Sequence, residues 1–234
     1  MPNVSRRGGR LTEQHKPKTV LETALVDFKR SAETTRDVRF QANLRLSGRE
    51  RGSSYIVSLL SLYVIGLSLI PNIVELKPFQ SQILLGCSIV LSVFVIFTSL
   101  IDGAQNFFHP GELLHQCART IAVVHHALKT IDVSHDPGAA KLQLETLQKD
   151  YQSALDECPI NHENVDFYKE IASKPHLFPQ QYNSILPRSV VSFGYRVLYL
   201  TLGKLWVAPH LAAFAAISVV VYFAIFIDPH LIGK

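Results

Sequence analysis

SSYIVSLLSLYVIGLSLI (residues 53–70) and ILLGCSIVLSVFVIFTSLI (residues 83–101) are two apolar runs that contain no charged side chain. Each run is about as long as the ~30 Å hydrocarbon core of a membrane requires. A segment that crosses lipid must satisfy its own backbone hydrogen bonds, so both runs are predicted to be helices. A transmembrane hairpin over residues 53–101 is therefore the centre of the fold, and it excludes most classes of soluble enzyme.

The connector and the flanking charges predict how this hairpin is oriented. Residues 71–81 hold two prolines, one Glu and one Lys, which predicts a tight turn at the far membrane surface. The chain before residue 53 carries twelve Lys/Arg against six Asp/Glu, so the positive-inside rule places the N-terminus in the cytoplasm. No early apolar stretch resembles a cleavable leader, and we interpret the first run as a retained anchor.

The residues before the hairpin divide into two segments. Residues 1–19 form a polar, basic stretch without apolar periodicity, which predicts a disordered tail. Residues 20–52 repeat apolar side chains at three- and four-residue steps, which predicts an amphipathic cytoplasmic helix. The arginines near its end are expected to lie at the lipid headgroups, and attraction to anionic lipid explains them better than binding to nucleic acid.

Residues 102–172 are predicted to form a cytoplasmic helical domain. Pro110 suits the first turn of a helix over residues 111–131, and a second helix is expected over residues 139–156. The two would pack as an antiparallel hairpin, with the N-terminal helix as a candidate third member. The apolar side of the second helix is expected to hold Leu142, Leu147, Tyr151 and Leu155. No stretch alternates as a strand does, so the predicted fold class is an all-α membrane protein.

The C-terminal part adds a further apolar segment. Residues 173–206 begin with a proline-containing linker and continue into a helix over residues 190–206, whose mixture of Tyr, Trp and basic side chains is typical of a membrane interface. Residues 208–227 form a third uncharged apolar run, which predicts a third transmembrane helix over residues 207–228, with a buried helix as the alternative. Residues 229–234 are then a short tail on the outer side.

Serines recur at helical spacing in both spans and place their hydroxyls on one face of each helix. They are Ser54, Ser58, Ser61 and Ser68 in the first run and Ser81, Ser88, Ser92 and Ser99 in the second. One interpretation is helix packing with interhelical hydrogen bonds, and the other is the lining of a water-filled path in an oligomer. Neither span carries Asp, Glu, Lys, Arg or His, which disfavours a proton- or substrate-coupled transporter.

A search for catalytic or metal chemistry finds no specific motif. The pairs His115–Cys117 and His125–His126 have the wrong spacing to place two ligands on one helix face. The three cysteines are scattered, as reduced packing residues usually are. We expect no enzyme activity and no catalytic, cofactor or metal site.

One polar cluster, NHENVDFY over residues 161–168, concentrates two Asn, a His, two acids and two aromatic side chains in eight residues. Asn161 is positioned to cap a helix that is expected over residues 161–172. His162 and Asp166 are four residues apart and are expected to pair on one helix face. A capped helix with a structural His–Asp pair explains the cluster, and a ligand site is the alternative.

Three short motifs together resemble the SLATT family of bacterial two-span proteins. They are Arg39-Phe40-x-Ala42-x-x-Arg45-Leu46, Ser58-x-x-Ser61-x-Tyr63 and Asn161-His162-x-x-x-Asp166. The resemblance covers about residues 30–172, so the third apolar run is expected to lie outside the family core. Phe167 stands where the family pattern usually has a Tyr, and Tyr168 follows it.

The resemblance implies a membrane effector of a bacterial antiphage system that responds to a partner sensor or nucleotide-signalling protein. We therefore expect a multi-pass protein of the bacterial inner membrane that permeabilises or disrupts the membrane as a homo-oligomer in abortive infection. The serines are candidates for pore lining or helix packing. Candidates for a structural or signal-receiving role are Arg39, Arg45, Asn161, His162 and Asp166. The alternative is a membrane-anchored scaffold that recruits a soluble partner without conducting.

Overall fold

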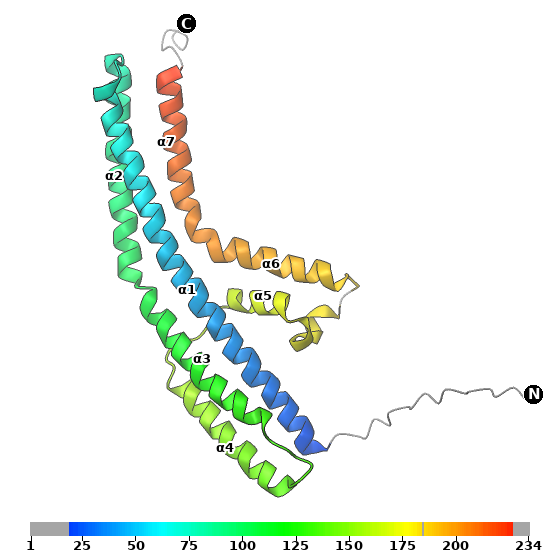
Figure 1. Cartoon of the computed structure of the whole chain (residues 1–234). Coiled ribbons are helices and arrows are strands. Elements are labelled where there is room, and N and C mark those ends of the chain that lie inside the picture. Colours follow the sequence, from blue (N-terminus) through cyan, green and yellow to red (C-terminus); the bar gives the residue numbers. More distant parts are fainter. Residues whose placement is uncertain (1–18, 184, 227–234) are drawn as a thin grey trace, which may run out of the picture.

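The computed structural model describes residues 19–183 and 185–226, and all regular elements in these two ranges are helical (Figure 1). The predicted all-α class is confirmed. Within these two ranges, three helical stretches are long and apolar enough to cross a membrane, at Val20–Ile73, Pro78–Lys129 and Arg188–Phe226. The tail predicted over residues 1–19 lies outside the described residues except for Thr19, and the tail predicted over residues 229–234 lies outside them entirely.

Helix α1 (Val20–Ile73) is a single rod that includes both the amphipathic segment and the first apolar run. Its 54 residues correspond to about 81 Å of length. A capping box begins it, since the Thr19 hydroxyl accepts from the Glu22 amide and the Glu22 carboxylate accepts from the Thr19 amide. The helix continues through Pro71, so the turn before α2 (Pro78–Gln105) is shorter than the connector predicted over residues 71–81.

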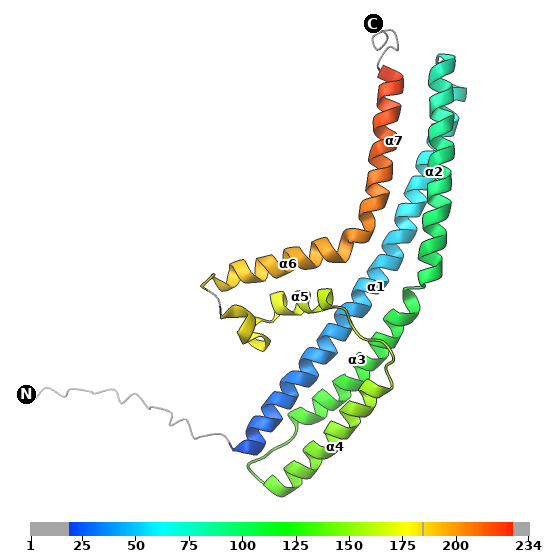
Figure 2. The ribbon, with the colours of Figure 1, turned by 180° about the vertical axis from the view of Figure 1, so that it is seen from behind.

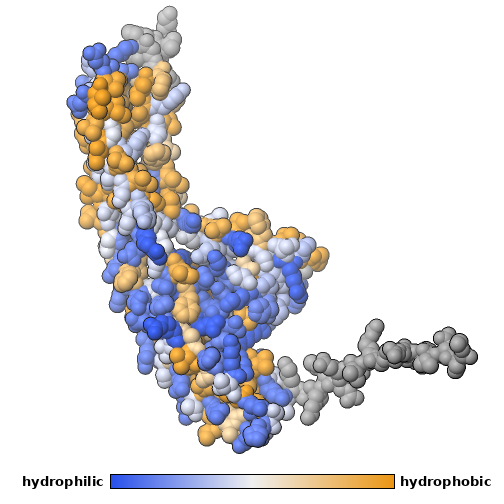
Figure 3. All heavy atoms as spheres, in the orientation of Figure 1, coloured by the Kyte–Doolittle hydropathy of each residue, from blue (hydrophilic) through white to orange (hydrophobic). Residues whose placement is uncertain are grey.

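The apolar half of the molecule consists of three segments: α2, α7 (Ala208–Phe226) and the second half of α1. They run side by side in both ribbon views (Figures 1 and 2). Their shared core contains Leu60 and Leu67 of α1 and Cys87, Leu91 and Val95 of α2, with side chains of α7 against them. Other large apolar side chains of this half remain exposed, and Figure 3 shows them as an orange surface. Such a surface indicates lipid as its surroundings, so the chain is a membrane protein.

The polar half is a bundle of the first half of α1, α3 (Phe108–Lys129) and α4 (Pro137–Asp156). A bend at Asn106, whose φ of 40° lies in the left-handed region that Asn tolerates, separates α2 from α3. The N-terminal helix is thus the third member of the bundle. The expected apolar side of α4 was wrong at Leu142, which is 67% exposed, whereas Leu144 is buried in the core.

An arm formed by α5 (Asn164–Ser173) and α6 (Arg188–Lys204) projects sideways at the junction of the two halves (Figure 1). Two short 3₁₀ turns, Pro175–Leu177 and Pro179–Tyr182, occupy the predicted linker. The turn η3 (Leu205–Val207) then redirects the chain into α7. The exposed side of α6 carries Phe193, Val197 and Leu200 at helical spacing, and the upper edge of the arm is partly apolar in Figure 3.

Candidate functional site

Arg45 of α1 and Asp166 of α5 form a buried ion pair, which we call the clamp together with Glu163. The Arg45 Nε lies 2.8 Å from Asp166 Oδ1, and its Nη2 lies 3.2 Å from Oδ2 and 2.9 Å from Glu163 Oε1. The Asp166 side chain is 0% exposed and that of Arg45 is 10% exposed. Burial alone would lower the pKa of Arg45, but the hydrogen bonds and charges of Asp166 and Glu163 outweigh it and raise this pKa.

The structure corrects two expectations about the polar cluster. Asn161 does not cap α5, because the N-cap is Glu163, whose amide donates to Asp166 Oδ2 at 3.1 Å. The Asn161 Oδ1 instead accepts from the His162 amide. His162 precedes the helix, so the four-residue spacing does not bring it to the Asp166 carboxylate, which binds Arg45. The His162 ring packs edge-on against Phe167 at 4.7 Å between centroids.

Arg39 lies one to two turns before Arg45 on α1 and is also buried. Its guanidinium donates to the Cys117 Sγ of α3. Burial is the main reason that the pKa of Cys117 rises to about 11, so the thiol stays neutral. Burial and then the charge of Arg39 lower the pKa of His162. Of the five predicted signal-receiving residues, Arg45 and Asp166 thus form the clamp, Arg39 and His162 are close enough for the charge of one to affect the other, and Asn161 is exposed.

A second ionic contact between α1 and α5 was missed from the sequence. The Lys174 ammonium binds the Asp37 carboxylate and lies 3.4 Å from Glu170 Oε2. Burial is the main cause that raises the pKa of Glu170. Nothing in the sequence marks these partners, because Asp37 and Lys174 are 137 positions apart in the chain.

The two serine series meet at the end of the apolar half that adjoins the polar half. A groove of about 440 Å³, which we call the hydroxyl groove, opens there between α1 and α2. Its polar lining consists of Glu50, Ser53, Ser54, Ser58, Ser99, Asp102 and Asn106. The Ser53 hydroxyl donates to Asp102, which ties the two helices together across the groove.

The remaining predicted serines lie elsewhere along the hairpin. Ser88 is buried in the helix interface, at 4% exposure, whereas Ser61, Ser68, Ser81 and Ser92 are half-buried. In the described part of the chain the bonded hydroxyls of both series donate to carbonyls of their own helix, so the expected interhelical hydrogen bonds between them are absent. The serines that donate in this way are Ser54, Ser58, Ser61, Ser68, Ser88 and Ser92. An interhelical bond comes instead from Tyr63, whose hydroxyl lies 3.1 Å from Ser218 Oγ of α7.

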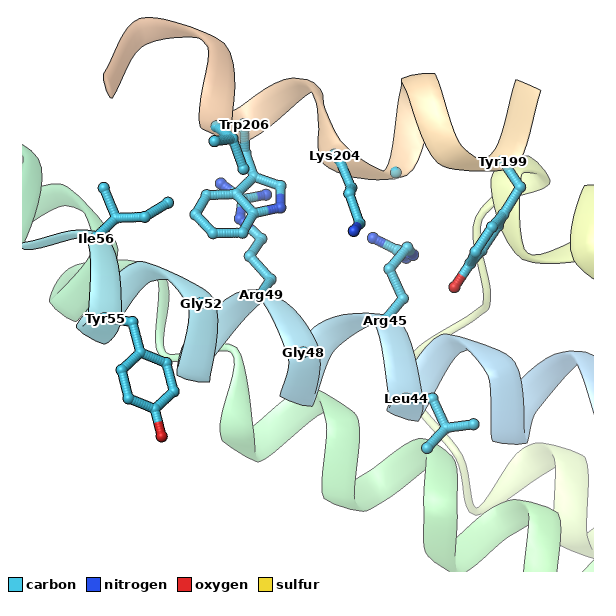
Figure 4. A pocket seen from close by; sticks show the side chains of 12 residues that line it. Leu44, Arg45, Gly48, Arg49, Gly52, Tyr55, Ile56, Tyr199, Lys204 and Trp206 are labelled. Atoms are coloured by element: carbon cyan, nitrogen blue, oxygen red, sulfur yellow. The ribbon is translucent and has the colours of Figure 1, made fainter. Parts of the chain in front are cut away.

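A second cavity, the basic pocket, lies on the other side of α1 beneath the turn from α6 to α7 (Figure 4). Its volume is about 530 Å³. Three cations line it, Arg45, Arg49 and Lys204, together with the aromatic rings of Tyr199 and Trp206. The two arginines were predicted to lie at the lipid headgroups, but no feature of the sequence predicted that Lys204 would join them.

The described residues form no candidate metal site. Within residues 19–183 and 185–226 no three His, Cys, Asp or Glu side chains come together as ligands for a metal ion. The expectation that the chain has no catalytic, cofactor or metal site stays a prediction.

Comparison with known proteins gives one result. The sequence model of a family described as "SMODS and SLOG-associating 2TM effector domain family 5" matches residues 21–224. The match includes α6 and nearly all of α7, so the expectation that the third apolar run lies outside the family core was wrong. No curated protein and no solved structure gives a significant match.

Proposed function

The chain belongs to the SMODS and SLOG-associating 2TM effector domain family, and we propose that it is a regulated membrane-permeabilising effector that acts as a homo-oligomer. We place it in the bacterial inner membrane, with its N-terminus and polar half in the cytoplasm, because basic residues dominate the chain before the first apolar run. In an antiphage system its activation would arrest or kill the infected cell. The family description supports a partner that carries a SMODS or SLOG domain.

The hydroxyl groove is the observation that carries this proposal. Ser54 and Ser58 come from one predicted serine face and Ser99 from the other, and the fold directs both into one polar cavity. Ser58 extends this polar groove from the headgroup level of Glu50 into the apolar run, where hydrocarbon offers no hydrogen-bond partners. Several copies that turn their grooves toward a common axis would remove them from lipid and enclose a water-filled path.

The chemistry of the groove favours cations. The Ser58 hydroxyl donates to the Ser54 carbonyl at 2.8 Å, which leaves its oxygen lone pairs as acceptors. Glu50 and Asp102 add carboxylates to the lining of the same groove. Rings of carboxylates select cations in channels, and hydroxyl oxygens can replace part of an ion's hydration shell. The apolar side chains beyond the groove, where Leu60 and Leu91 pack, would form the closed gate.

The clamp is positioned to control this assembly. Arg45 and Ser54 lie nine residues apart on the continuous helix α1, which corresponds to about 14 Å. Because α5 holds α1 through Arg45, a partner that displaces α5 would release the helix that carries one side of the groove. We therefore assign the clamp the role of receiving the signal.

Membrane potential tests the proposal directly. Bacteria expressing the full chain, with and without its genetic neighbours, would be followed with a voltage-sensitive dye. Ser58→Leu and Ser99→Leu should abolish depolarisation, because each places an apolar side chain in the groove. Ser88 is a poor choice for this purpose, since it is buried and a larger side chain there would disturb packing.

Gly86→Leu is the matched control for these substitutions. A Cβ at Gly86 meets nothing within 4 Å, and the residue is exposed on another side of α2. It should depolarise as the unmodified chain does. Depolarisation that persists in Ser58→Leu and Ser99→Leu, with the assembly intact by cross-linking, would show that the groove lines no path.

A membrane-anchored scaffold is the second candidate. Val123 and Leu142 are large apolar side chains exposed on the polar half, as a docking surface for a soluble partner would require. The two functions differ in assembly, since a path enclosed by grooves needs several copies and a tether needs one or two. The mass of the detergent-solubilised protein would discriminate between them.

A further inference from the structure

The basic pocket lies at the level where charged sequence gives way to apolar sequence. Arg51 is the last charged residue of α1 before the first apolar run, and Lys204 is the last Lys or Arg before α7. Between them, η3 places Trp206 over Gly52 (Figure 4). Trp and basic side chains occupy this depth in membrane proteins, where lipid phosphates lie.

The charges in the pocket are unbalanced. Among the residues that line it there are three cations and no carboxylate. Arg45 is neutralised from the side by Asp166 and Glu163. Arg49 makes its direct contacts with neutral groups, the Gln105 oxygen at 3.1 Å and the rings of Phe107 at 4.0 Å and Trp206 at 5.9 Å, while the carboxylates of Asp102 and Glu163 act on it as more distant charges. The Arg49 Nε is buried without a hydrogen-bond partner in the described part of the chain.

Lys204 adds a cation to the pocket. It has no Asp or Glu oxygen within 4 Å among residues 19–183 and 185–226. In Figure 4 its side chain points toward that of Arg45 rather than away from it. Cations that converge without an anion between them repel one another, so the arrangement has the electrostatics of an anion site.

The shape of the pocket is also that of a ligand site. Its volume of about 530 Å³ is in the range of small-molecule pockets, and Tyr199 and Trp206 give it aromatic walls. Two glycines of α1 form its floor. A Cβ at Gly52 would lie 2.9 Å from the Trp206 ring, so only glycine lets the indole approach this closely. A Cβ at Gly48 would meet nothing within 4 Å, so Gly48 leaves the floor open.

We propose that this pocket binds a phosphate group through Arg49, Lys204 and the free edge of Arg45. Guanidinium and ammonium groups are the donors that proteins use for phosphate. The phosphate belongs either to an anionic lipid headgroup, which the depth and the aromatic walls fit, or to a soluble phosphate ester. Phosphate binding at this site does not require conduction, so the binding proposal can be tested separately from the proposed pore.

Fluorescence of Trp206, the single tryptophan of the chain, reports on the pocket. The full chain in neutral detergent would be titrated with short-chain phosphatidylglycerol, with short-chain phosphatidylcholine, with inorganic phosphate and with adenosine monophosphate. Native mass spectrometry of the same samples would count bound molecules, so that a spectroscopically silent complex is also detected. We expect saturable binding of phosphatidylglycerol and none of phosphatidylcholine.

Variants test whether the binding occurs in the pocket. Arg49→Gln and Lys204→Gln should each weaken it about fivefold, which corresponds to about 1 kcal/mol per cation. Gly48→Leu should abolish it by filling the floor. Gly194→Leu is the matched control, because Gly194 of α6 is also open within 4 Å and does not line the pocket.

Each outcome decides the proposal. Saturation by phosphatidylglycerol alone identifies the lipid as the source of the phosphate, and saturation by inorganic phosphate or adenosine monophosphate identifies a soluble ester. Absence of binding for all anionic probes overturns the proposal. So does equal binding of phosphatidylcholine, or binding that Gly48→Leu and Lys204→Gln leave unchanged.

Discussion

Replacing Asp166 by Asn is the most direct perturbation of the clamp, because it removes the carboxylate charge and nearly preserves the side-chain volume. The Arg45 guanidinium would remain 10% exposed, facing an amide and the largely exposed Glu163. Removing one partner of a buried ion pair costs about 3–5 kcal/mol, because the other charge stays buried and unpaired. Glu163 still offers one oxygen at 2.9 Å, so we expect a value near the lower end, about 3 kcal/mol.

Thermal unfolding of the full chain in detergent, followed by circular dichroism at ~222 nm, measures this effect. For a chain of this size, about 3 kcal/mol corresponds to a fall in Tm of roughly 6–12 °C. Lys141→Gln is the control, because Lys141 and Glu145 form an exposed pair at 3.9 Å, and such pairs contribute little. We expect its Tm to stay close to that of the unmodified chain.

The double variant Arg45→Gln with Asp166→Asn isolates the coupling between the two charges. It removes the unpaired cation, so its Tm should lie above that expected from adding the two single changes. A fall in Tm for Asp166→Asn no larger than that of Lys141→Gln would refute the reasoning. That result would show that water screens the pair and that α5 is held by other contacts.

Three further predictions concern the polar half and the groove. Lowering the pH from about 7.5 to about 5.5 should lower the Tm, because burial and then the charges of Arg36 and Lys129 lower the pKa of His125 in the folded protein. The neutral His125 stabilises the fold above the unfolded pKa of about 6.5, and this contribution is lost as the pH falls toward the folded pKa. His125→Gln should flatten this pH dependence in the same melt. Glu50→Gln with Asp102→Asn should reduce the preference for cations in reversal-potential measurements on planar bilayers, and an unchanged preference would exclude the groove as the selective region. Maleimide at neutral pH should label the partly exposed Cys158 before the buried Cys117, as mass spectrometry of the digested protein would show.

The sequence was sufficient for the features that depend on long apolar runs. The charge-free stretches of α1, α2 and α7 are each long enough to identify a spanning helix without knowledge of its neighbours. The expected third helix of the polar bundle also follows from local periodicity. The serine faces could be predicted because a helix fixes the direction of each side chain relative to the last.

The errors arose where a residue's environment depends on distant segments. Leu142 lies five positions before Leu147, which is not a helical repeat, whereas Leu144, Leu147 and Tyr151 follow steps of three and four and contact the core. The Asp166 carboxylate was assigned to His162 because both belong to one short motif. Arg45, its actual partner, is 121 positions away, and no periodicity connects them.

Arg45 belongs both to the clamp and to the basic pocket. Its guanidinium uses Nε and Nη2 for Asp166 and Glu163, and the same side chain lines the pocket toward Lys204. A phosphate on the free edge of Arg45 would be a second anion beside the clamp carboxylates and would repel them, so the proposed ligand and the clamp oppose each other. Linkage requires the converse as well, so loss of the Asp166 charge should tighten phosphate binding, which the Trp206 titration of Asp166→Asn would measure. Because α1 is one continuous helix, with no flexible joint between Arg45 and Ser54, a displacement of α1 at Arg45 would also move Ser54.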